Sequence, residues 1–200
     1  MPGMPPPAAD ERSSLIEFLR FNQNAFIAVA YGLSDEQARS TPSVSALSIG
    51  GLIKHATGVQ KGWMDRVQHA PEFPPADPRP IAEQIAAYQD QYVMAEDETL
   101  DQLLDGLRAQ NASTLELFAE RDLDTPVPVP HEVPWFPHDI DHWTVRWVAM
   151  HLLEELTRHA GHADIIRESI DGATMYVLMA GLEGWPETDW IKPWRPAVVR

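Results

Sequence analysis

The chain has 200 residues, enough for a single domain, and its 30 acidic side chains outnumber 15 basic ones to give a formal charge of -15. This charge repels phosphate backbones and anionic lipid, which argues against nucleic acid and membrane partners. The absence of cysteine excludes disulfides and thiolate ligands, and the lack of a long apolar run or signal peptide favours a cytoplasmic protein.

Helical periodicity predicts an all-α fold, a four-helix bundle that spans residues 10–172. We expect residues 1–9 to form a flexible, Pro-rich leader. Residues 173–200 form a Trp- and Pro-rich C-terminal tail that either packs on the bundle or covers an interface. Exposed Trp and Phe residues make a homodimer a candidate assembly. The tail carries Trp185, Trp190 and Trp194.

The four long helices are separated by segments rich in helix-breaking residues. They are predicted over residues 10–31, 46–69, 96–121 and 143–170. A shorter helical piece at residues 80–92 precedes the third long helix. The Pro-rich segment TPVPVPHEVPWFPHDIDH lies before the fourth and favours extended backbone with a short pair of edge strands.

The fourth predicted helix contains the most informative stretch, WVAMHLLEELTRHAGHADIIRE, at residues 147–168. At 100° per residue, three histidines fall within about 40° of Glu155, on a stripe that is otherwise apolar. These histidines are His151, His159 and His162. An isolated carboxylate on such a face costs several kcal/mol unless it is paired, protonated or bound to a metal. The opposite face, predicted to meet solvent, carries Arg146, Thr157 and Asp164.

A histidine on the second helix lies in a similar setting. His55 is a polar residue on an apolar stripe between Leu52 and Val59. Glu155 and His159 are one turn apart and can reach a single ion together with a residue from a facing helix. Two histidines and one glutamate leave a coordination position open, as in catalytic zinc sites. Zinc is our first choice, and nickel, iron or manganese accept the same ligands.

Interpretations without a metal remain open at this stage. A single histidine on an apolar face is more often a hydrogen-bonded core residue than a ligand. A buried ion-pair network that includes Arg158 would also account for the polar band, although Arg158 and Glu154 have the spacing of a surface pair. The remaining histidines are expected at the surface, with the last two near the mouth of a site: His69, His131, His138 and His142.

Two stretches of the chain resemble the DinB-like superfamily, in particular its branch related to mycothiol-dependent maleylpyruvate isomerase. They are LSDEQARSTPSVSALSIGGLIKHATGVQKGW and TVRWVAMHLLEELTRHAGHADIIRESIDG, at residues 33–63 and 144–172. The resemblance implies a four-helix bundle that binds a divalent metal through His55, Glu155 and His159. His151 and His162 fall outside this ligand set and are candidates for a base or for partners of the ligands.

The resemblance also implies chemistry with low-molecular-weight thiols, because the family includes thiol S-transferases and the isomerase itself. The isomerase has an additional C-terminal domain, whereas only about 30 residues follow the fourth helix here, which favours S-transfer. We therefore expect a metal-dependent transferase that conjugates a thiol, with mycothiol as the first candidate, to an electrophilic small molecule through a metal-bound thiolate. The alternatives are a non-catalytic metal or small-ligand binding protein and a thiol-dependent isomerase.

Overall fold

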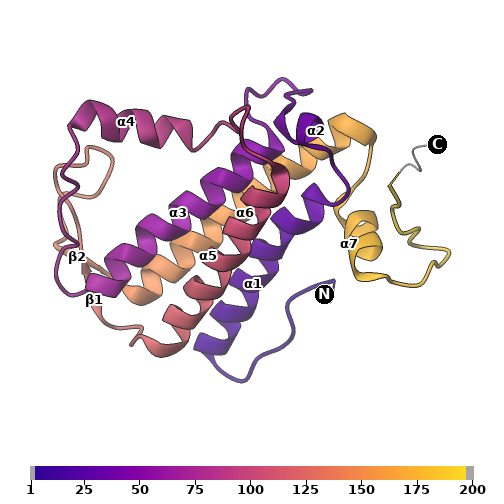
Figure 1. Ribbon diagram of the computed structural model, residues 1–200. Helices are drawn as coiled ribbons and strands as arrows, with labels where there is room; N and C mark the ends of the chain where they lie inside the picture. Colours follow the sequence, from indigo (N-terminus) through magenta and orange to yellow (C-terminus); the bar gives the residue numbers. More distant parts are fainter. Residues whose placement is uncertain (1–2, 197–200) are drawn as a thin grey trace.

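A computed structural model describes residues 3–196, which form seven helices and two short strands (Figure 1). Four long helices run side by side, which confirms the predicted all-α four-helix bundle. They are α1 (Glu11–Ala30), α3 (Ile49–His69), α5 (Leu100–Glu120) and α6 (Val145–Asp171). Helix α1 packs on α5 and α6, and α3 packs on the same two helices. Helices α3 and α6, which carry the predicted ligands, are therefore neighbours.

Side-chain caps set the ends of these helices and correct two predicted starts. The hydroxyl of Ser48 accepts a hydrogen bond from the Gly51 amide, so α3 begins at Ile49 rather than at residue 46. Thr99 forms a capping box with Gln102, so α5 begins at Leu100 rather than at residue 96. These caps satisfy the free N–H groups of the first turn. The predicted end of α6 is confirmed, because Gly172 adopts a left-handed conformation with φ of 76°.

The bundle encloses one apolar core with a small polar network inside it. The amide of Gln23 donates to Gln60 at 2.8 Å, and the amide of Gln60 donates to Asn111 at 2.9 Å. This network links α1, α3 and α5, and it satisfies the polar groups that these side chains bury. None of the helices in the described part of the chain is both long and apolar enough to cross a membrane.

The smaller elements lie at the two ends of the bundle (Figure 1). The predicted strand pair is present as β1 (Pro126–Pro128) and β2 (His142–Thr144), which pair antiparallel. Helix α4 (Ile81–Asp90) matches the predicted helical piece and has no buried residue. Helices α2 (Asp35–Arg39) and α7 (Met175–Glu183) were not predicted. The α7 segment was missed because the Pro- and Trp-rich stretch that follows it suggested irregular structure.

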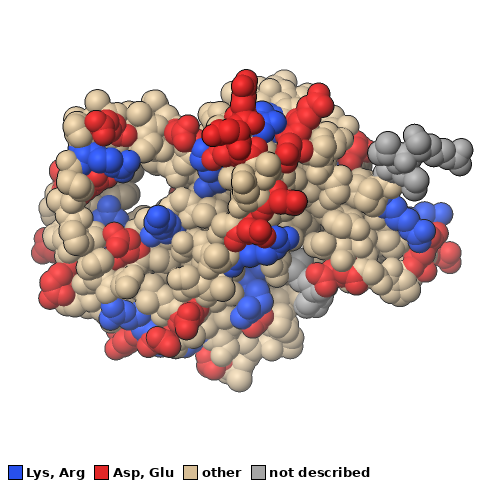
Figure 2. Space-filling view, viewed as in Figure 1, with Lys and Arg blue, Asp and Glu red and all other residues tan. Residues whose placement is uncertain are grey.

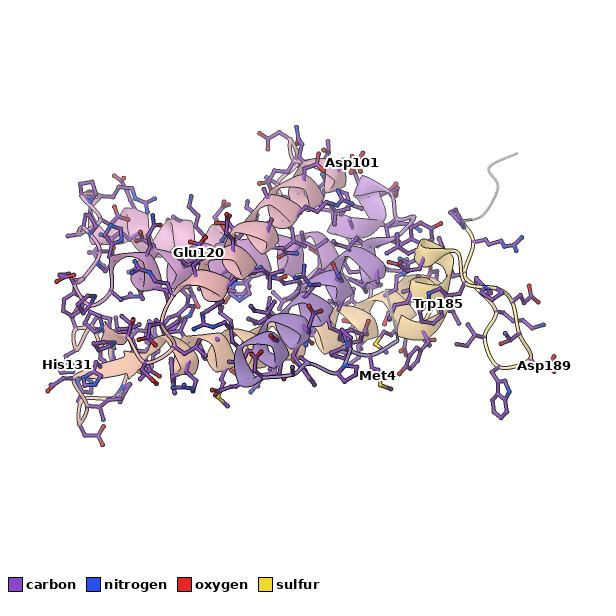
Figure 3. All side chains as sticks on the ribbon, turned by 90° about the horizontal axis from the view of Figure 1, so that it is seen from below. Met4, Asp101, Glu120, His131, Trp185 and Asp189 are labelled. Atoms are coloured by element: carbon purple, nitrogen blue, oxygen red, sulfur yellow. The ribbon has the colours of Figure 1, made fainter. Side chains whose placement is uncertain are left out.

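The C-terminal tail contacts the bundle through one of its three tryptophans. Trp194 meets the ring of Tyr31 edge to face and lies 4.7 Å from the guanidinium of the buried Arg167. Trp190 is 95% exposed, and Trp185 lies beside α7 at the end of the bundle opposite His131 (Figure 3). Residues 1–2 of the predicted leader and residues 197–200 of the predicted tail lie outside the described residues.

The face of α6 opposite Glu155 meets solvent only in part. Thr157 is exposed, as predicted, and its hydroxyl donates to the Asn22 amide oxygen of α1 at 3.0 Å, whereas Asp164 is half-buried. The reason is that α6 packs between α1 and α3 rather than against α3 alone. Burial, followed by the negative charge of Glu168, raises the pKa of Asp164 from 3.8 to about 6.

Replacement of Asp164 by Asn should stabilise the protein at neutral pH. The folded protein holds the Asp164 proton more tightly than the unfolded chain, so the wild type loses stability as pH rises from about 4 to about 6. Asp164→Asn removes this loss, and we expect a gain on the order of 1 kcal/mol at pH 7 and none at pH 3.5. Urea unfolding at both pH values measures it, with the exposed Asp97→Asn as control. An equal gain in stability at both pH values would contradict a raised pKa of Asp164 in the folded protein.

Candidate metal centre

The three predicted ligands meet at the seam between α3 and α6. His55 comes from α3, and Glu155 and His159 come from α6, one turn apart. One potential ligand atom from each of the three residues lies within 4.8 Å of the other two. The rings of His55 and His159 meet edge to face with centroids 4.6 Å apart, and His159 Nε2 lies 3.3 Å from Glu155 Oε2. This spacing suits three donors that share one ion.

His55 has no protein partner for either of its ring nitrogens. The side chain is 3% exposed, and neither Nδ1 nor Nε2 makes a hydrogen bond within the described residues. The other buried polar side chains of the described chain all have such partners. An unsatisfied buried polar group costs about 1 to 3 kcal/mol. A metal ion bound to one nitrogen would remove the part of this penalty that belongs to that nitrogen, so the donor set fits a divalent cation.

The protonation states favour metal binding. Burial, followed by the charge of His159, lowers the pKa of His55 to about 4, although Glu155 and the Gln91 side chain act in the opposite direction. His55 is therefore neutral at neutral pH, the form that binds a metal. Hydrogen bonding to His159 lowers the pKa of Glu155, against the opposing effect of its own burial. The site thus presents neutral imidazole and ionised carboxylate to an ion.

The two additional histidines of α6 lie in different surroundings. His151 Nε2 lies 3.7 Å from Glu155 Oε1, and its ring stacks on Trp147 with centroids 5.1 Å apart. His162 Nε2 instead pairs with the Ser45 hydroxyl at 2.8 Å. His151 lines the cleft in front of Glu155, whereas His162 is not among the residues that line it. Only His151 can therefore meet a molecule in that cleft.

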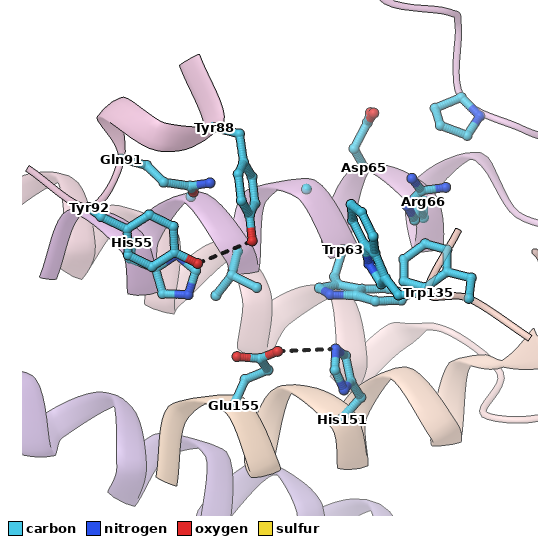
Figure 4. Close-up of a pocket in the computed structure, with 15 residues that line it drawn as sticks. His55, Trp63, Asp65, Arg66, Tyr88, Gln91, Tyr92, Trp135, His151 and Glu155 are labelled. Atoms are coloured by element: carbon cyan, nitrogen blue, oxygen red, sulfur yellow. Dashed lines mark hydrogen bonds and ion pairs between the residues drawn. The ribbon is translucent and has the colours of Figure 1, made fainter. Parts of the chain in front are cut away.

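The cleft in front of the ligands, here called the inner chamber, has a volume of about 490 Å³ (Figure 4). Its walls come from α3, from α6, from the segment that ends α4, and from the loops that carry Pro74 and Trp135. Tyr92 covers His55, with the two rings stacked at 4.2 Å, and its hydroxyl lies 3.2 Å from that of Tyr88. Burial raises the pKa of Tyr92. Trp63 forms the opposite wall beside His151.

The interpretation that includes Arg158 in a buried network is wrong. Arg158 is 80% exposed and pairs with Glu154 at 3.6 Å, as the i,i+4 spacing predicted. His131, His138 and His142 are exposed, and none of them lines the inner chamber. His69 pairs with Asp65 at the end of α3. These four histidines stay outside the site.

Sequence reasoning missed the covering side chains of the site. Tyr88, Gln91 and Tyr92 line the inner chamber, and Trp63 and Arg66 line it from α3. The signal for the α3 residues was present, because Arg66 follows His55 by about three helical turns and so returns to the same face. The tyrosines gave no signal, since the position of α4 over the cleft depends on contacts between distant segments.

Comparisons with known proteins agree with the fold. The family model described as Mycothiol-S-transferase matches residues 14–172, more than half of the chain, and this family belongs to the DinB-like superfamily. A solved structure titled as a conserved protein from Enterococcus faecalis is similar over 83% of this chain and 100% of its own, with 15% identity and a TM-score of 0.55. At that identity the likeness shows the fold alone. No curated protein matches the chain.

Replacement of His55 by Leu should remove metal binding while stabilising the metal-free protein. The substitution eliminates two unsatisfied buried nitrogens. We therefore expect the free energy of unfolding of the metal-free form to increase by about 1 kcal/mol. Zinc at a hundredfold excess over its Kd should stabilise the wild type by about 2.7 kcal/mol and leave the variant unchanged. Elemental analysis and thermal unfolding with and without zinc measure both effects.

His131→Ala is the control, because this histidine is exposed and is not part of the ligand group. It should keep one metal ion per chain. A His55→Leu variant that retained stoichiometric metal, or a metal-free variant less stable than wild type, would assign His55 to the core instead.

Proposed function

The chain belongs to the mycothiol S-transferase family, and we propose that it conjugates mycothiol to an electrophilic small molecule at the site of His55, Glu155 and His159. The unpartnered ring nitrogens of His55, at the base of the inner chamber, carry this proposal. The three residues would hold a divalent metal, with zinc as first choice. Such a cation lowers the pKa of a coordinated thiol, because positive charge stabilises the thiolate.

The thiol of the reaction must come from a small molecule, because the protein has no cysteine. The sulfur of the small thiol forms a bond to the electrophilic carbon. In a substitution, the leaving group departs with the electron pair of its bond to that carbon. In an addition to a conjugated double bond, a proton returns to the neighbouring carbon. In both cases the thiol proton must first be removed within the inner chamber.

His151 is the residue that we propose to accept this proton. Its ring lies between the carboxylates of Glu154 and Glu155, with one ring nitrogen 3.7 Å from each. Trp63 and Trp147 hold the ring by aromatic contacts at 4.8 and 5.1 Å. A base held in this way is positioned before the substrate arrives.

The proposal is tested with zinc-loaded protein, mycothiol and a panel of electrophiles such as 1-chloro-2,4-dinitrobenzene. We expect a conjugate that depends on the protein, on zinc and on the thiol, detected by absorbance and mass spectrometry. Glutathione and cysteine in place of mycothiol measure thiol preference. If zinc and mycothiol bind without turnover of any electrophile, the chain is a binding protein of the same fold and the transferase proposal fails.

Replacement of His151 by Gln should lower kcat for conjugation by about 100-fold, because a positioned base contributes a factor on this order. The zinc content should stay at one per chain, since His151 is outside the His55–Glu155–His159 ligand group. The His162→Gln variant distinguishes the two candidate bases. Its decrease in kcat should be smaller than that of His151→Gln, because His162 pairs with Ser45 away from the chamber. Loss of zinc from His151→Gln would make His151 a ligand, and equal losses would refute its assignment as the base.

A further inference from the structure

A second and larger cavity adjoins the inner chamber. This outer chamber has a volume of about 1080 Å³ and lies between α4, the segment 73–77 and the segment 130–135. The two chambers share four lining residues: Arg66, Pro74, Tyr88 and Trp135. Figure 2 shows the molecule hollowed beneath α4. A molecule bound in the inner chamber can therefore extend into the outer one without leaving the cleft.

The outer chamber exposes an unusual amount of apolar surface. Its walls include five large hydrophobic side chains that are each more than half exposed: Phe73, Ile81, Ile85, Tyr88 and Trp135. Three of these lie on one face of α4, at spacings of four and three residues, yet no residue of α4 is buried. An amphipathic helix normally buries its apolar face. Here that face lines a cavity, which is the arrangement expected of a binding site for an apolar group.

One cation stands at the junction of the two chambers. The guanidinium of Arg66 lies 5.9 Å from the ring centroid of Trp63, beside Trp135 (Figure 4). The side chain makes no ion pair or side-chain hydrogen bond within the described residues, although the chain carries a charge of -15. Burial lowers the pKa of Arg66, so its charge is only partly solvated. A half-buried guanidinium without a carboxylate partner is suited to bind an anion.

The negative groups nearby do not fill this role. Glu132 and Asp65 act on Arg66 through their charge but lie beyond ion-pair distance. Asp77 also lines the outer chamber, but it is paired with Arg79 at 2.6 Å. The guanidinium therefore remains open to a ligand.

We propose that the electrophile is an elongated anionic amphiphile whose acidic group pairs with Arg66 and whose apolar part occupies the outer chamber. The identification of this ligand as the electrophile rests on the proposed transferase function, whereas the binding site itself does not. Arg66 follows His55 along α3 by roughly 16 Å, given a rise of 1.5 Å per residue. The acidic group must accordingly lie several bonds from the carbon that reacts near His55.

The chemistry of the two reactants indicates that the anionic amphiphile is the electrophile and not the thiol. Mycothiol is a sugar-linked thiol whose hydroxyl and amide groups are uncharged at neutral pH, so it has neither an anion for Arg66 nor an apolar body. Its thiol end needs only the inner chamber, where the three ligands converge. The apolar walls and the cation then remain for the second reactant.

The binding site is tested with two fluorescent probes that differ in one charged group. The probes are 8-anilinonaphthalene-1-sulfonate and its uncharged counterpart N-phenyl-1-naphthylamine, titrated into the full chain with and without zinc. We expect the sulfonate to bind about tenfold more tightly to the wild type, because a charge-assisted contact contributes on this order. Arg66→Ala should remove this difference and leave the affinity of the neutral probe within threefold. Equal affinity of the wild type for both probes would overturn the proposal.

Matched variants separate the two parts of the site. Ile85→Glu places a charge on the apolar face of α4 and should weaken both probes at least tenfold. Ile165→Glu, at a comparably exposed isoleucine of α6 outside both chambers, should change neither. Arg108→Ala, which removes an exposed arginine of α5, should also leave both affinities unchanged. If Ile85→Glu instead lowered the molecular mass in solution, the apolar face would be a contact between two copies and the proposal would fail.

Conjugation kinetics then test the identity of the ligand. Pairs of electrophiles that differ as carboxylate and methyl ester should show a preference for the carboxylate of about tenfold in kcat/KM, lost in Arg66→Ala. The expected probe binding without turnover of any electrophile would refute the transferase function and leave an anionic amphiphile as the ligand. Turnover without a preference for the carboxylate would refute the present inference alone.

Discussion

Burial of an imidazole without a hydrogen-bond partner costs about 1 to 3 kcal/mol, and among the described residues only His55 is held in this way. The surrounding structure enforces the burial. Gly51 on α3 lies so close to the Tyr92 carbonyl that a β-carbon would collide with it, and at Gly58 a β-carbon would displace the Gln91 side chain. These glycines allow the segment after α4 to lie against α3, where Tyr92 stacks on His55. Lys54 holds the same segment by ion pairs with Asp90 and Glu98 at 3.0 and 2.9 Å. Specific contacts of the surrounding residues therefore keep the imidazole buried, and a role as metal ligand explains its position.

The placement of α4 links this constraint to the cleft. Because its C-terminal end is fixed over His55 while none of its residues is buried, the helix covers the cavity beneath it (Figure 2). The inner chamber is lined by residues that can bind a cation or accept a proton, and the outer chamber is lined mainly by apolar side chains. Arg66 stands where the two environments meet. A site divided in this way separates the reacting atoms from the groups that select the substrate, so selectivity can change without altering the ligands.

The bundle was accessible from helical periodicity, and the choice of His55, Glu155 and His159 as one group rested on periodicity together with the family resemblance. A polar residue on an apolar stripe is visible at 100° per residue, and α6 carries four of them. The covering parts were not accessible in this way. The position of Tyr92 depends on glycine contacts between distant segments, and the half-burial of Asp164 depends on α6 lying between two helices. Helix α7 was missed because a nine-residue helix next to a Pro- and Trp-rich stretch gives a weak signal.

Family membership and geometry bear on different questions about the function. The match to the mycothiol S-transferase family identifies the class of chemistry, and it does not identify the electrophile. The overall charge of -15 would repel an anionic substrate from most of the surface. An arginine without a carboxylate partner in such a protein is therefore informative, since most sites on the molecule offer an anion no favourable contact. Binding of an anionic amphiphile then depends on burial of its apolar part, which compensates for repulsion at long range and brings the acidic group to Arg66. On this basis the apolar chamber and the single cation act together, and neither feature alone would select the substrate.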